Sequence, residues 1–210
     1  PVIVAGSNEG WTGEYESEKI RFYIKDKEFL EKYGVDRVIG HTQMDVNCEF
    51  FKKYYPQYVG KVISLPFGYQ CRFKCNRSFD DRKNIAVGLG SINPTDDPLL
   101  DKEAKKELVE FYSDKQFMHP LRRYIQTHDK EFCDVIETKF PTPDKQKDFS
   151  YDAVEMLNRY KMFLNDAGLS NFPPARTYEG IACGCVMVAE QNSIYDQIGF
   201  IPDVNYIAYE

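Results

Sequence analysis

Residues 173–190, PPARTYEGIACGCVMVAE, constrain the fold most, because here a short helix must pass almost directly into a buried strand. Two prolines suit the first turn of a helix, and Gly184 suits the left-handed position just beyond its end. The run 185–189 is apolar and β-branched, as strands covered on both faces tend to be. This helix–strand unit predicts a layered α/β domain built on a parallel sheet.

The same alternation of helix and strand runs along the whole chain. Apolar runs ended by Gly, Pro or polar residues predict further strands at 2–5, 36–40, 61–65, 84–89, 133–138, 161–164 and 205–209. Helical spacing of apolar residues predicts helices at 27–33, 47–55, 99–112, 120–128 and 150–160. We therefore expect two Rossmann-like units with parallel sheets and right-handed crossovers, the first of them incomplete. Their predicted bounds are residues 1–70 and 84–210, joined by a polar connection at 71–83.

Composition excludes some partners. The 210 residues carry 27 basic and 33 acidic side chains, a net charge of −6, and no basic run that would bind a nucleic-acid backbone. No apolar run approaches the roughly 20 residues of a membrane span, and no signal peptide is visible. The six cysteines lack zinc-site spacing and are expected to be reduced, which favours a cytoplasmic location. A single sequon, Asn76-Arg77-Ser78, leaves the secretory lumen open.

Arg176 and Glu179 are the unusual members of the opening stretch. They lie three residues apart, and so on one face of the predicted helix. Parallel sheets bind ligands at the carboxyl ends of their strands, where a carboxylate can accept hydrogen bonds from ribose hydroxyls and an arginine can hold phosphate. The alternative is an exposed ion pair worth a few tenths of a kcal/mol.

The pattern Arg176-x-x-Glu179-x-x-Ala182-Cys183-Gly184, followed by an apolar strand, resembles the donor-binding signature of GT-B glycosyltransferases. The nearest types are group 1, exostosin-like and spore-maturation-type sequences. The resemblance implies a nucleotide-sugar donor, a Glu near its ribose, no cofactor, and an acceptor that is a glycan, lipid or protein. It extends weakly from residue 36 to the end, past a Leu65-Pro66-Phe67-Gly68 junction. Complete members are longer at both ends, so we expect this chain, which begins at Pro1, to be part of such an enzyme.

A second candidate site follows the predicted strand 84–89. Gly90 and Ser91 come directly after it, and a glycine turn can bring backbone N–H groups close to a phosphate. Arg122 lies in the first turn of the helix that Pro120 begins, where helix N–H groups and a guanidinium together suit a diphosphate. The resemblance implies the same role for a basic residue here, and we prefer Arg122 to Arg123. The alternatives are an ordinary turn and a solvated basic face.

The remaining candidates concern catalysis and metals. His41 follows the strand 36–40 and is the candidate catalytic base or sugar contact on the acceptor side. Retaining members carry an acidic residue eight positions before the ribose Glu; here that position is Asn171, which puts retaining chemistry in doubt. No Asp-x-Asp element stands where a metal-dependent transferase needs one, and His119 and His128 lie far from other ligand types. We therefore expect no essential metal.

Together these features predict a metal-independent glycosyltransferase that moves a sugar, such as a hexose, from a nucleotide-sugar donor. Glu179, Arg176, Gly90, Ser91 and Arg122 are the predicted donor contacts. A second hypothesis is a non-catalytic α/β interaction or nucleotide-binding fragment of a larger transferase. A third is an unrelated α/β binding protein in which the Arg–Glu pattern is a coincidence.

Overall fold

The computed structural model describes residues 3–5, 36–40, 43–96, 102–141, 151–169 and 171–209. The chain divides into two compact units, Pro1–Phe67 and Gly68–Glu210. This boundary lies three residues before the predicted end of the first unit at residue 70. The predicted helix 27–33 and the candidate base His41 lie outside the described residues.

The first unit contains a parallel sheet of three short strands. These are β1 (Ile3–Ala5), β2 (Arg37–Gly40) and β3 (Val62–Ser64), in the order β1-β2-β3. Between β2 and β3 come α3 (Met44–Asn47), α4 (Glu49–Tyr54) and the 3-10 helix η1 (Pro56–Tyr58). The helix predicted at 47–55 is α4, which begins two residues later than predicted because the backbone of Cys48 is extended (φ −116°, ψ 105°). The four-residue helix α3 before it was not predicted.

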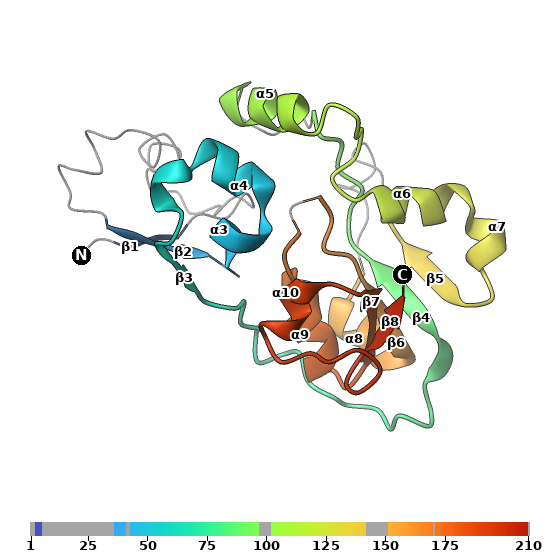
Figure 1. The fold of residues 1–210 in the computed structure, drawn as a ribbon. Helices are drawn as coiled ribbons and strands as arrows, with labels where there is room; N and C mark the ends of the chain where they lie inside the picture. Colours follow the sequence, from blue (N-terminus) through green and yellow to red (C-terminus); the bar gives the residue numbers. More distant parts are fainter. Residues whose placement is uncertain are drawn as a thin grey trace. The chain divides into compact units, whose positions relative to one another are not determined.

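The second unit is built on five parallel strands. These are β4 (Lys83–Leu89), β5 (Ile136–Lys139), β6 (Tyr160–Asn165), β7 (Val186–Glu190) and β8 (Ile207–Tyr209). They lie in the order β5-β4-β6-β7-β8 (Figure 1). Counted along the chain this order is 2-1-3-4-5, one of the two common orders of doubly wound sheets. The strand order reverses between β4 and β6, and such a switch point is where these sheets bind ligands.

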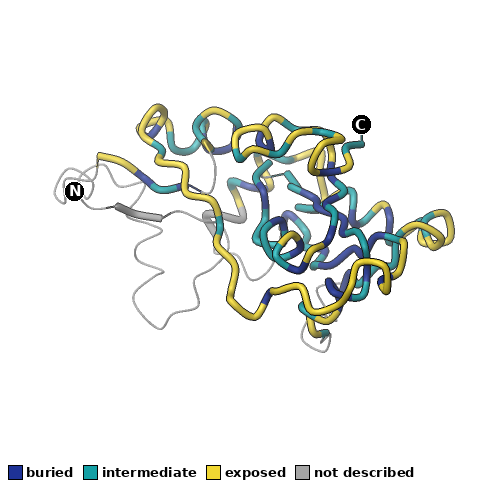
Figure 2. Tube along the Cα trace, turned by 90° about the horizontal axis from the view of Figure 1, so that it is seen from below, coloured by how far each residue is buried: buried dark blue, intermediate teal, exposed yellow. Residues whose placement is uncertain are grey.

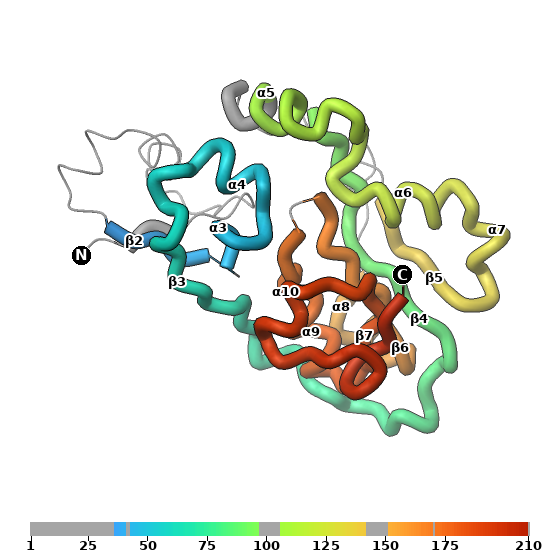
Figure 3. The backbone as a smooth tube through the Cα atoms, viewed as in Figure 1, coloured from blue at the N-terminus to red at the C-terminus, as the bar shows by residue number. Residues whose placement is uncertain are grey.

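Helices connect every pair of successive strands in this sheet. The chain passes through α5 (Lys102–Phe111), α6 (Pro120–Thr127) and α7 (Asp129–Phe132) before it returns as β5 (Figure 3). The helices α8 (Ala153–Arg159), α9 (Ala175–Ala182) and α10 (Ser193–Asp196) precede β6, β7 and β8. The mixed α/β class with parallel sheets is confirmed. The four-residue helices α7 and α10 were not predicted, since one turn is too short to show a helical period.

Two hydrophobic clusters cover the two faces of the five-stranded sheet. Phe163 and Leu164 are neighbours on β6, and neighbours on a strand point to opposite faces. Phe163 packs in the larger cluster, which includes Val87, Leu157, Met187 and Ile194. Leu164 packs in the smaller one, with Ile92, Ile125 and Phe140. The dark-blue segments in Figure 2 trace these buried residues. Burial on both faces explains the apolar runs of β4, β6 and β7.

Helix α8 runs into β6 without a loop. Its N-terminus is capped by Asp152, whose side chain accepts hydrogen bonds from the backbone N–H groups of Val154 (2.8 Å) and Glu155 (3.2 Å). The helix ends at Arg159, and Tyr160 is already extended and is the first residue of the strand. Tyr160 is completely buried in the larger hydrophobic cluster, and this packing fixes where the helix ends and the strand begins.

The predicted connection at 71–83 packs on the second unit. Phe73 is buried in the larger cluster, and the backbone N–H of Asn76 donates to Asn158 Oδ1 at 2.9 Å. Arg82 is 5% exposed and donates to the carbonyl oxygen of Arg77 (2.8 Å) and to Cys75 Sγ (3.1 Å). Most other residues of this segment are exposed, as Figure 2 shows in yellow. These contacts make the segment an outer layer of the second unit.

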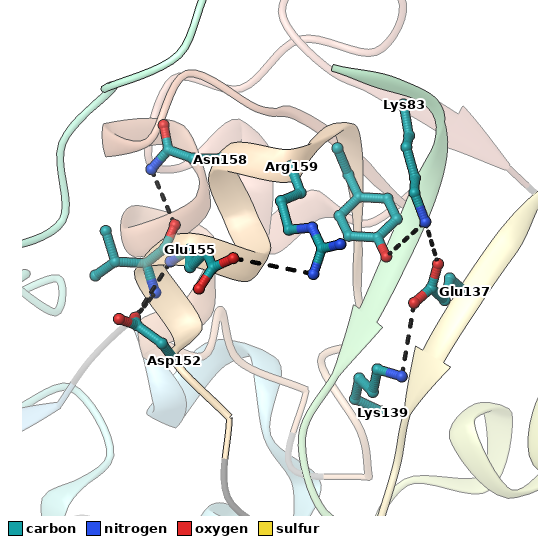
Figure 4. A network of polar contacts seen from close by, with 9 residues as sticks. Lys83, Glu137, Lys139, Asp152, Glu155, Asn158 and Arg159 are labelled. Carbon is teal, nitrogen blue, oxygen red and sulfur yellow. Dashed lines mark hydrogen bonds and ion pairs between the residues drawn. The ribbon is translucent and has the colours of Figure 1, made fainter. Parts of the chain in front are cut away.

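A polar network joins three neighbouring strands of this unit, β5, β4 and β6 (Figure 4). Lys83 Nζ on β4 donates to Glu137 Oε2 on β5 at 2.8 Å and lies 3.5 Å from the hydroxyl of Tyr160 on β6. Lys139 also approaches Glu137, at 3.6 Å. The hydrogen bond from Lys83, aided by Tyr160, lowers the pKa of Glu137 to about 2.

We expect Glu137→Gln to weaken the acid dependence of stability. Because the pKa of Glu137 is lower in the folded state, its stabilisation is fully present above the ordinary Glu value of about 4.3. It is lost as the pH falls from there towards about 2. The free energy of unfolding in urea, measured from pH 5 to pH 2.5, should therefore fall less in the variant than in the wild type. Parallel curves for the two proteins would show that the pair does not stabilise the fold.

Candidate functional site

Three predicted residues meet at the switch point of the five-stranded sheet. Gly90 is the first residue after β4 and has a φ of +129°. A Cβ atom at Gly90 would lie 2.5 Å from Nη1 of Arg122, in the first turn of α6. The same Nη1 donates a hydrogen bond to the carbonyl oxygen of Ser91 at 3.1 Å. The fold thus brings Gly90, Ser91 and Arg122 together, and glycine is needed for the guanidinium to approach the backbone.

Arg122 has a counter-ion that the sequence analysis did not find. Its Nε lies 3.3 Å from Oδ2 of Asp166, and its Nη2 donates to the backbone oxygen of Asp166 at 3.4 Å. Asp166 is the first residue after β6, and both residues are 8% exposed. Burial raises the pKa of Asp166, but the hydrogen bond with His119 and the charge of Arg122 outweigh it and lower this pKa below its ordinary value. The guanidinium is therefore already paired with a carboxylate.

His119 completes this group. Its Nδ1 lies 3.1 Å from the same Oδ2 of Asp166, and its side chain is 20% exposed. Gly168, in the loop after β6, lies close to both side chains. Its backbone N–H donates to Asp166 Oδ1 at 2.8 Å, and a Cβ atom at Gly168 would lie 2.7 Å from His119 Nδ1. We call His119, Arg122 and Asp166 the switch-point cluster. It joins the ends of β4 and β6 through the start of α6.

The sequence contained a partial signal for the cluster. Asp166 follows a predicted strand, and His119 precedes the proline that begins a predicted helix. They are 47 residues apart, however, and only the strand order brings them together.

Arg176 and Glu179 form a second polar group on α9. Arg176 Nη1 lies 3.1 Å from Glu179 Oε2 in an ion pair that lacks hydrogen-bond geometry. Their side chains are 22% and 18% exposed, so this is not the exposed pair of the alternative interpretation. Thr177 accepts a hydrogen bond from Asn165 Nδ2 at 2.9 Å, which holds the start of α9 at the carboxyl end of β6. This pair lies on α9, whereas the switch-point cluster lies at the start of α6 and in the loop after β6.

Two other residues have structural roles. Arg123 donates to Gln126 Oε1 at 2.7 Å and lies over the ring of Phe117, while its neighbour Arg122 reaches the cluster. Asn171 has a φ of +51° and accepts a hydrogen bond from the side chain of Asn192, the N-cap of α10. Asn171 therefore links the loop before α9 to the start of α10.

The described residues contain no metal-ligand group, no membrane-spanning helix and no disulfide. No group of three or more His, Cys, Asp or Glu side chains among them could hold a metal ion. None of the helices in the described ranges has the length and apolar character to cross a bilayer. All six cysteines are unpaired.

Comparison with known proteins assigns no family. No protein-family model, no curated protein and no solved structure matches the chain. The resemblance to GT-B glycosyltransferases therefore stays a prediction.

Proposed function

We propose that the chain binds a nucleotide-sugar at the carboxyl edge of its five-stranded sheet and takes part in transfer of the sugar to an acceptor. The observation that carries this proposal is the meeting of Gly90, Ser91 and Arg122 at the switch point. A doubly wound sheet offers its ligand site at this position. A glycine turn backed by an arginine suits the diphosphate, which combines negative charge with many acceptor oxygens.

Glu179 is the proposed ribose contact. Its carboxylate is held by Arg176 and is mostly shielded from water, so it has a defined direction and a strengthened capacity to accept hydrogen bonds. The likeness of residues 176–184 to the donor-binding signature supports this role. Arg176 orients the carboxylate in this proposal. Both side chains come from α9, whose first turn is bonded to the end of β6.

We expect Glu179→Gln to weaken nucleotide-sugar binding about ten- to a hundredfold, the value of one or two hydrogen bonds to a charged group. The melting temperature should change little, because the amide keeps the shape of the carboxylate and the contact with Arg176 lacks hydrogen-bond geometry. Isothermal titration calorimetry with UDP-glucose and GDP-mannose measures the affinity. The control is Glu155→Gln on α8, whose carboxylate has a weak contact with Arg159 at 4.0 Å. Equal affinities in both variants would argue against Glu179 as the ribose contact.

A thermal-shift screen against UDP, GDP, ADP and their sugars identifies the donor. A ligand specific for the folded state at a hundredfold excess over its Kd stabilises by about 2.7 kcal/mol. If none of these compounds raises the melting temperature, the nucleotide-sugar proposal is wrong. The third interpretation, an unrelated binding protein, would then remain.

Asn171 favours a second candidate function, a nucleotide-binding domain without turnover. Its side chain is bonded to Asn192, and an amide cannot supply the negative charge that the acid of retaining members provides. This candidate predicts nucleotide-sugar binding with neither transfer nor hydrolysis. Release of UDP or GDP, measured with a panel of glycan, lipid and peptide acceptors, distinguishes it from the transferase.

A further inference from the structure

The charges of the switch-point cluster sum to zero while His119 is neutral. The guanidinium of Arg122 carries one positive charge, and the carboxylate of Asp166, 3.3 Å away, carries one negative charge. A diphosphate at this edge would therefore meet a paired arginine and a nearby carboxylate. A leaving diphosphate needs positive charge close to it. The cluster as it stands lacks the net charge that the proposed function requires.

His119 can supply that charge. Histidine is the side chain that ordinarily gains or loses a proton between pH 5 and 8. Nδ1 of His119 faces Oδ2 of Asp166 at 3.1 Å, so the hydrogen of the neutral ring belongs on Nδ1 and is donated to the carboxylate. Nε2 is then the nitrogen that can take up a proton. In the described part of the chain Nε2 has no hydrogen-bond partner, and the side chain is partly exposed.

We propose that His119 binds the diphosphate of the nucleotide-sugar as an imidazolium, so that ligand binding takes up a proton. The inference rests on the proposed function and adds to it a residue outside the predicted donor contacts. The proton comes from solvent and bonds to Nε2. The new N–H then donates to a phosphate oxygen, and no other bond changes. Asp166 is the positioning residue, because it fixes the ring through Nδ1 and stabilises its positive charge.

The groups around His119 support this assignment. Asp166, from the loop after β6, is ionised and lies against the ring, and the positive charge of Arg122 on α6 is itself paired with Asp166. From the described part of the loop after β4, the backbone oxygen of Ser91 accepts a hydrogen bond from Arg122. Tyr195 on α10 and Tyr209 on β8 interact electrostatically with Asp166, and burial raises the pKa of both phenols, which stay neutral.

Proton uptake can be measured directly. UDP-glucose and GDP-mannose carry diphosphate diesters, which do not titrate near neutral pH, so a proton taken up on binding must enter the protein. Calorimetric titration at pH 7 in phosphate, HEPES and Tris, which differ in ionisation enthalpy, gives the number of protons. We expect uptake in the wild type, no uptake in His119→Gln, and an affinity about tenfold lower in that variant. His128→Gln is the matched control, because the His128 ring bonds to Thr127 and Tyr124 at the end of α6, away from the cluster, and this variant should keep the wild-type uptake.

The outcomes separate this inference from the proposed function. If neither sugar nucleotide binds the wild type, both fail. If one binds without proton uptake, or with uptake that persists in His119→Gln, only the role of His119 is wrong. Should His119→Gln fail to fold, ¹⁵N NMR of the histidine-labelled wild type answers the same question. The Nδ1 and Nε2 signals of His119 must move to imidazolium positions when ligand is added, and unchanged signals would overturn the inference.

Discussion

Replacing Gly90 by Ala is expected to lower the free energy of unfolding of the second unit by about 2–4 kcal/mol and to reduce nucleotide-sugar affinity. Two costs combine. A φ of +129° is outside the range that L side chains adopt readily, and the new methyl group would lie 2.5 Å from Arg122 Nη1. The guanidinium cannot simply move away, since it is bonded to Ser91 and paired with Asp166 in a buried site. Urea unfolding gives the stability, and calorimetric titration gives the affinity.

Gly199→Ala is the matched control for this prediction. Gly199 also has a positive φ, +85°, but a Cβ there would have no atom within 4 Å. Its replacement therefore has only the backbone cost, about 1–2 kcal/mol, and no effect on the ligand. If both variants lose the same stability and both keep wild-type affinity, then the close approach of Arg122 to Gly90 contributes neither to stability nor to ligand binding.

Asp166→Asn is expected to destabilise the second unit by about 3 kcal/mol, because Arg122 would keep its charge in a buried site without a counter-ion. The amide retains the shape of the carboxylate, so the loss of stability would result from the missing negative charge. The variant should also lose proton uptake on ligand binding, since His119 would no longer face an anion. Urea unfolding at pH 7 measures the first effect and calorimetry the second.

A double variant tests the cause of this loss. Arg122→Met with Asp166→Asn removes both charges, and a buried ion pair replaced by neutral groups is often close to neutral in stability. We expect the double variant to be more stable than Asp166→Asn alone. If the losses of the two single variants simply add, pairing of the charges is not what stabilises the cluster.

Asp166 also gives the stability a definite pH dependence. Its pKa is lowered in the folded state, so its contribution is complete above the ordinary Asp value of about 3.9 and is lost as the pH falls below that value. In Asp166→Asn this part of the acid dependence should disappear. The dependence due to Glu137 should remain in that variant.

Much of the fold was predictable because strands buried on both faces are apolar and are ended by glycine or polar residues. The predicted strand 84–89 is β4, and the predicted helix and strand in 173–190 are α9 and β7. The start of α4 after Cys48 was not predictable to the residue, because Phe50, Phe51 and Tyr54 keep helical spacing regardless of what precedes them. Strand order is likewise absent from local periodicity, since it depends on packing between distant segments.

The candidate site was predictable only in part, for the same reason. Gly90 and Arg122 could be chosen by their positions next to a strand end and a helix start. Asp166 and His119 could not be paired with them until β6 was known to lie beside β4. His41 is outside the described residues, and the roles of Arg176 and Glu179 as ligand contacts stay predictions.

The direct passage from Arg159 to Tyr160 limits how this protein can change in length. One residue inserted between α8 and β6 would shift the register of β6 by one residue. Phe163 and Leu164 would then point to the wrong faces of the sheet. Both hydrophobic clusters would be disrupted, and Asp166 would be carried away from Arg122. Insertions and deletions should therefore be excluded between residues 153 and 166 in any homologue that keeps the switch-point cluster, while substitutions on the exposed side of α8 are accepted.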